Sequence, residues 1–111
     1  MALQIGLKYI FFILIILAAV LEVIGDIYLK KWAMESKNLL FIIGMALYIV
    51  GSVFWALSLK YEYLSKAVSV FFVLNMVILV LAGALLFKEN LSLTNKIGIT
   101  LAIISIVLIE A

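Results

Sequence analysis

The chain has 111 residues, of which 69% are hydrophobic and 13% are charged, and it contains no Pro, Cys or His. This composition is more apolar than the core of a soluble domain requires, so it predicts an integral membrane protein. The net charge is +2, and the largest basic cluster is Lys30-Lys31, which argues against a nucleic-acid partner. The lack of Cys and His excludes disulfides and disfavours a zinc site, and we expect neither a metal nor a cofactor.

Four apolar segments predict four transmembrane helices, because a helix needs about 20 apolar residues to cross a bilayer. We expect these helices at approximately residues 8–31, 38–59, 66–87 and 92–110 of a single membrane domain that covers residues 1–111. The fourth segment is the shortest, and Ser92 or Thr94 in the polar turn before it can cap its helix. A cleaved signal peptide is a poor explanation of the first segment, because three more apolar segments follow. The predicted fold class is all-α, a four-transmembrane-helix bundle.

The lysines are divided almost evenly between the two predicted sides of the membrane. Three lie on the side of the N-terminus and the second connection, namely Lys8, Lys60 and Lys66. Five lie on the opposite side, namely Lys30, Lys31, Lys37, Lys88 and Lys96. The positive-inside bias is therefore weak, and we expect the chain either to insert in both orientations or to prefer weakly an N-terminus on the outside.

Two carboxylates interrupt the first apolar segment, in the stretch "LAAVLEVIGDIYLKKW". Glu22 lies roughly 4–5 Å beyond the middle of the predicted helix, and Asp26 lies roughly 10 Å beyond it. A carboxylate near mid-membrane costs about 2.5–3.5 kcal/mol, so a functional role explains Glu22 better than packing does. A Glu that is neutral in the empty site and ionised when a cation arrives would exchange protons for cations. The alternative is an inert, protonated Glu that is hydrogen-bonded inside the bundle.

Asp26 has a local partner in the sequence, because Lys30 follows it by four residues on the same helix face. An interfacial charge tied to Lys30 is the favoured interpretation of Asp26, and membership of the site is the alternative.

Polar and aromatic residues of the second and third helices are further candidates. Tyr48 and Ser52 share one helix face with Trp55, and the two aromatic rings could form the wall of a cation site or pack as bulky residues. Asn75 places an amide at mid-depth, where a helix–helix hydrogen bond is the favoured role and substrate contact the alternative.

Small residues form a stripe on the fourth helix at Gly98, Ala102 and Ser105. Such a stripe favours close approach of another helix, and we expect a dimer interface there, with packing inside the chain as the alternative.

The chain resembles the small multidrug resistance family of the drug/metabolite transporter superfamily. The resemblance rests on Glu22 within "LEVIG", Lys30, four helices in about 110 residues, and the ending "GALLFKENLSLTNKIGITLAIISIVLI". It implies a dimer, usually antiparallel, in which Glu22 of both subunits binds either protons or substrate. The second subunit of such a dimer would supply the second of the two related halves that transporters commonly need, because this chain holds only one.

The chain departs from the drug-exporting members of that family in the third helix. By position, their Tyr and Trp fall on Val70 and Val73, their Gly-x-Gly hinge on Asn75-Met76-Val77, and the preceding Pro on Ser65. In the second helix, Tyr48 or Trp55 can match the aromatic pair of the family. These departures indicate a divergent member and argue against broad export of aromatic cations.

We therefore expect a multi-pass protein of the cell (inner) membrane, functional as a homodimer with antiparallel subunits favoured. Its expected function is proton-coupled antiport of a small polar or cationic compound through Glu22. A subunit similar to lipid-linked sugar flippases, or a non-transporting partner subunit of a heteromeric transporter, is the alternative. An enzyme is not expected, because the sequence shows no nucleophile, metal set or phosphate loop.

Overall fold

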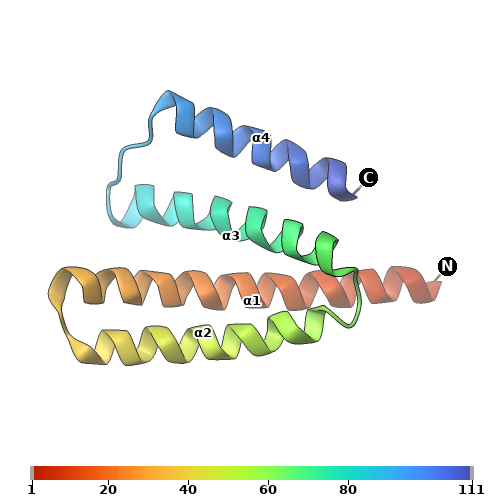
Figure 1. Cartoon of the computed structure of the whole chain (residues 1–111), viewed down its shortest axis with the longest axis horizontal. Helices are drawn as coiled ribbons and strands as arrows, with labels where there is room; N and C mark the ends of the chain where they lie inside the picture. The colour runs from red at the N-terminus through yellow and green to blue at the C-terminus, as the bar shows by residue number, and fades with distance from the viewer. Residues whose placement is uncertain (1, 111) are drawn as a thin grey trace.

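A computed structural model describes the backbone of residues 2–110 and the side chains of residues 6–109. Met1 and Ala111, the ends of the predicted domain, lie outside the described residues. The four helices are α1 (Ala2–Glu35), α2 (Asn38–Ser58), α3 (Leu64–Leu86) and α4 (Leu93–Glu110) (Figure 1). Within residues 2–110 no strand is present, and the predicted all-α, four-helix fold is confirmed.

α1 is longer than the sequence predicted, because it begins at Ala2 and ends at Glu35 instead of spanning residues 8–31. No Pro interrupts the polar stretch after Lys30, so the helix continues beyond the apolar segment. At about 1.5 Å per residue a helix of this length extends roughly 51 Å, more than the roughly 30 Å of a bilayer core. α1, α2 and α3 are each long and apolar enough to cross a membrane, whereas the apolar part of α4 is shorter.

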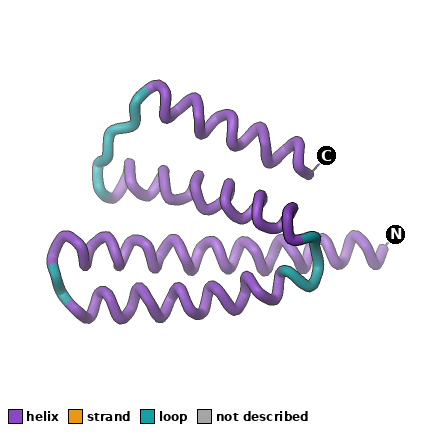
Figure 2. The backbone as a smooth tube through the Cα atoms, viewed as in Figure 1, coloured by secondary structure: helices purple, strands orange, loops and turns teal. Residues whose placement is uncertain are grey.

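The connections between the helices are short (Figure 2). Ser36 ends α1 with a left-handed backbone at a φ of 59°, and Lys88 adopts a φ of 52° after α3. Ser92 caps α4, because its hydroxyl accepts a hydrogen bond of 3.1 Å from the Asn95 amide. The predicted cap at the start of the fourth helix is thus found at Ser92.

The helices form an open arrangement in which α1 lies between α2 and α3, and α4 lies on the far side of α3 (Figure 1). α1 packs most extensively against α2, α3 packs against α1, and α4 packs against α3. The α1–α2 turn and the α3–α4 connection lie at the same end of the molecule. Many apolar side chains remain exposed in this single chain, as expected for surfaces that face lipid or another subunit.

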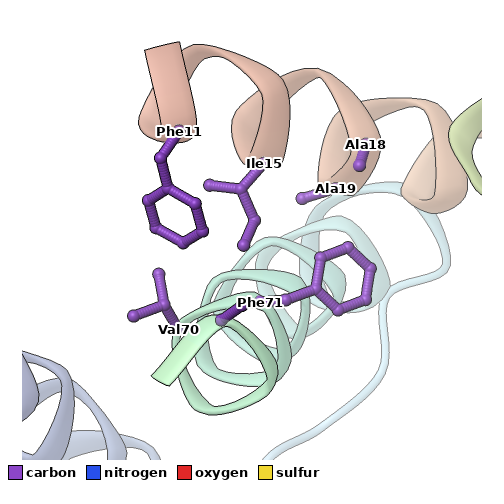
Figure 3. Packing of buried hydrophobic residues seen from close by; sticks show 7 residues of the cluster. Phe11, Ile15, Ala18, Ala19, Val70 and Phe71 are labelled. Carbon is purple, nitrogen blue, oxygen red and sulfur yellow. The ribbon is translucent and has the colours of Figure 1, made fainter. Parts of the chain in front are cut away.

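The buried core lies between the first half of α1 and the first half of α3. Figure 3 shows Phe11 and Ile15 of α1 facing Val70 of α3, and all three are almost completely buried. Ala18 and Ala19 continue this surface along α1 toward Glu22. The core therefore fixes the orientation of α1 about its axis, and with it the direction in which the carboxylates of the next turns point.

Candidate functional site

Glycines allow α1 and α2 to approach closely beside the two carboxylates. A Cβ atom added at Gly25 would lie 2.9 Å from Cδ2 of Tyr48 and 3.0 Å from the carbonyl oxygen of Gly44. A Cβ atom added at Gly51 would lie 2.9 Å from Cγ of Glu22. The two distances to carbon atoms are shorter than an ordinary contact between carbon atoms, and the distance to the carbonyl oxygen is also tight, so only glycine fits at either position without a shift of its neighbours. Because Gly25 and Gly51 have no side chains, the ring of Tyr48 and the stem of Glu22 can occupy the space beside them.

Asp26 is hydrogen-bonded across the helix interface rather than along its own helix. The hydroxyl of Tyr48 on α2 donates to Oδ1 of Asp26 on α1. Ion pairs in the described part of the chain join Lys37 to Glu35 and Lys66 to Glu62, and none joins Asp26 to Lys30. The predicted Asp26–Lys30 ion pair is therefore wrong. The ring of Tyr48 lies against Gly25, which brings its hydroxyl to Asp26 and leaves Lys30 exposed.

Glu22 lies one helical turn before Asp26, at the same α1–α2 interface. Its aliphatic stem packs over Gly51 of α2. Its Oε2 atom is buried and has no hydrogen-bond partner among the residues that the structure describes. A buried oxygen without a donor is costly, which is typical of a group that acts on a proton or ligand.

The other candidates on α2 have different surroundings. The Ser52 hydroxyl donates to the carbonyl oxygen of Tyr48 at 2.9 Å, within its own helix. The Trp55 ring packs against Phe71 of α3, with 4.9 Å between the ring centroids, and joins the apolar core. The structure therefore brings Tyr48 to the carboxylates, whereas it gives Trp55 a packing role. Participation of Ser52 and Trp55 in a site stays a prediction.

Asn75 on α3 has a buried Oδ1 atom that finds no hydrogen-bond donor within the described chain. The predicted helix–helix hydrogen bond is thus not made by this atom. Asn75 lines a pocket of about 340 Å³ together with residues of α3 and the α3–α4 connection. Contact of Asn75 with a substrate stays a prediction.

The stripe on α4 faces a groove of about 600 Å³ between α3 and α4. Gly98, Ala102 and Ser105 line this groove together with Met76 and Val80 of α3. A Cβ atom added at Gly98 would meet nothing within 4 Å. The chain's own helices leave Gly98 uncovered, and the use of the stripe as a dimer interface stays a prediction.

Glu89 was not singled out from the sequence, although the structure places it beside Asp26. Asp26 and Lys30 of α1, Gly83 of α3, and Glu89 of the α3–α4 connection line a pocket of about 230 Å³. The only signal in the sequence is one acidic residue in a polar turn, which is common in membrane proteins. No group of three His, Cys, Asp or Glu that could hold a metal occurs among the described residues.

Comparison with known proteins adds one finding to this geometry. The family model described as Small Multidrug Resistance protein matches residues 9–102, which include Glu22, Asp26, Tyr48 and Asn75. No solved structure matches the chain.

Proposed function

The chain belongs to the small multidrug resistance family, whose members are membrane transporters and not enzymes, and we propose that it exchanges protons for a small polar or cationic compound. The observation that carries this proposal is the buried Oε2 atom of Glu22, which lacks a donor within residues 6–109. A carboxyl group in this position has two ways to compensate its burial, a bound proton or a bound cation.

Competition between a proton and the substrate cation for the carboxyl group of Glu22 couples the movement of one to the movement of the other. When the site is empty, Glu22 holds a proton and is neutral. An incoming cation pairs with the carboxylate and displaces the proton, because the two cannot share the same oxygen atoms. Release of the cation on the other side restores the protonated form.

The surroundings of Glu22 support a small substrate. Val70, which stands where drug-exporting relatives have an aromatic residue, is fully buried in the core. Trp55 is packed on Phe71. The remaining aromatic neighbour, Tyr48, donates its hydroxyl to Asp26. Few aromatic surfaces are therefore left for a large aromatic cation.

The proposed working unit is a homodimer in the cell (inner) membrane, with antiparallel subunits favoured. Dimers are typical of the family. A single copy has only four helices, of which α4 packs against α3 at one side of the molecule. The nearly balanced lysines are compatible with insertion in both orientations.

A second candidate function is favoured by the groove between α3 and α4. Its lining is largely apolar and includes Met76, Val80 and Leu101. An acyl or polyprenyl tail would fit such a surface, as in a flippase-like subunit for lipid-linked sugars, or as in a partner subunit of a heteromeric transporter. Neither alternative requires Glu22.

The test is proton movement in liposomes that contain the purified protein. Guanidinium, quaternary ammonium and polyamine cations are applied to wild type, Glu22→Gln and Glu35→Gln. Glu35 is a matched control, because it also loses one charge on α1 but forms only an exposed ion pair with Lys37. We expect cation-driven proton movement in wild type and Glu35→Gln, and none in Glu22→Gln. The same proton movement in Glu22→Gln, or none with any cation in wild type, would overturn the proposal.

A further inference from the structure

The connection after α3 folds Glu89 back onto the end of that helix. The backbone amides of Phe87 and Glu89 both donate to the carbonyl oxygen of Gly83, each at 3.1 Å. The left-handed backbone of Lys88 produces this reversal. The Glu89 carboxylate then lies against Gly83, in space that a Cβ atom at that position would occupy.

Glu89 belongs to two adjoining pockets. The first has a volume of about 230 Å³ and includes Asp26 and Lys30 of α1. The second has a volume of about 340 Å³ and includes Asn75 of α3. Leu79 also lines both pockets, so the two pockets adjoin at Leu79 and Glu89.

The polar atoms of these pockets favour a cation. Asp26 and Glu89 contribute carboxylates, and the buried Oδ1 atom of Asn75 meets no donor from the described side chains. The donor that reaches Asp26 is Tyr48, and Lys30 is the one cationic side chain in the two linings. Acceptors therefore outnumber donors, and a ligand with positive charge complements them.

We propose that Glu89 is a substrate-binding residue that captures the substrate cation in the pocket that it shares with Asp26. This inference rests on the proposed function, because it assumes that a cation is transported. Glu89 is exposed, so it can contact a hydrated cation before the cation enters the membrane-spanning part of the site. The Glu89 carboxylate affects how tightly the cation is first bound, and not the exchange of protons at Glu22.

The experiment records the initial rate of cation-driven proton movement in liposomes for guanidinium, tetramethylammonium and 1,4-diaminobutane over a range of concentrations. Glu89→Gln is compared with Glu35→Gln, since both remove an exposed carboxylate at the same end of the molecule. We expect Glu89→Gln to raise the apparent KM roughly three- to tenfold with an unchanged maximal rate of proton movement, and Glu35→Gln to change neither. The difference in KM between Glu89→Gln and wild type should shrink at high salt, where an exposed charge is screened.

A purely structural role of Glu89 predicts another pattern. Glu89→Asp keeps the charge and should retain most of the affinity, whereas loss of the turn would lower the maximal rate of proton movement and the melting temperature in both Glu89 variants. Equal KM values for Glu89→Gln and Glu35→Gln, or a KM difference that salt does not change, would overturn the inference alone. Unchanged proton movement in Glu22→Gln, or no wild-type proton movement with any of the three cations, would overturn the proposed function and this inference together.

Discussion

At the scale of single residues, the two carboxylates of α1 differ in their partners. Asp26 accepts a hydrogen bond from the Tyr48 hydroxyl, whereas the buried Oε2 atom of Glu22 has no donor in the part of the chain described. A donor stabilises a carboxylate that has left water, so Asp26 is held in place, and we propose that Glu22 binds a proton or a cation instead. This difference, rather than the presence of two acids, is what singles out Glu22.

Tyr48→Phe removes the donor of Asp26 and keeps the ring that packs on Gly25. We expect it to lower the free energy of unfolding by about 0.6 kcal/mol, the average for a hydrogen bond between membrane helices in double-mutant cycles, and by no more than about 2 kcal/mol. The measurement is unfolding in mixed micelles for Tyr48→Phe, Asp26→Asn and the double variant. Tyr9→Phe is the control, because Tyr9 is 67% exposed. If the effects of Tyr48→Phe and Asp26→Asn were additive, the two side chains would not be coupled.

At the scale of helices, glycine contacts fix the distance between α1 and α2. Gly25 and Gly44 face each other so closely that an added Cβ at either position would lie 3.0 Å from the other residue's carbonyl oxygen. A backbone atom cannot rotate away as a side chain can. The contact therefore sets the spacing in which Tyr48 reaches Asp26 and Glu22 lies over Gly51.

Gly25→Ala should weaken this interface. Alanine gains up to about 1 kcal/mol over glycine in helix propensity, but overpacking typically costs about 1–3 kcal/mol. We expect a net loss of stability in unfolding measurements, together with lower transport. Gly6→Ala on the same helix is the matched control, since an added Cβ there meets nothing within 4 Å. Equal stability of the two variants would mean that the α1–α2 contact is not tight.

The helices could be predicted from the sequence better than their contacts. Apolar segments and the cap at Ser92 located α4 to within one residue of its start at Leu93. The extent of α1 was underestimated, because hydropathy marks the part that suits lipid and not the polar turns that continue the helix. The partner of Asp26 was missed, because local spacing favoured Lys30 while Tyr48 depends on how α1 and α2 pack. Glu89 was missed for the same reason, since its position depends on the fold of a connection.

At the scale of the whole molecule, the single chain leaves large apolar surfaces uncovered. Leu101 is 59% exposed and Leu108 is 70% exposed on α4, and Gly98 faces an open groove. A second copy that covers this surface would bury the stripe of small residues and complete the site from both subunits. Lipid would cover the remaining apolar faces.

Gly98→Leu should disrupt the dimer and leave the fold of each chain intact. The larger side chain finds space in the single chain, because an added Cβ meets nothing within 4 Å, but it would obstruct a helix of another copy. The measurement is cross-linking in bilayers over a range of protein-to-lipid ratios. Gly6→Leu, also free of neighbours within 4 Å, is the control. Dimerisation of Gly98→Leu at wild-type levels would place the interface elsewhere.

The central claim is that one buried carboxyl group, Glu22, carries the proton that a cation displaces. It is tested most directly by adding a transported cation to purified protein in a weakly buffered detergent solution and recording the protons released. We expect proton release by wild type and by Asp26→Asn, and none by Glu22→Gln. Release of the same size from Glu22→Gln would contradict it.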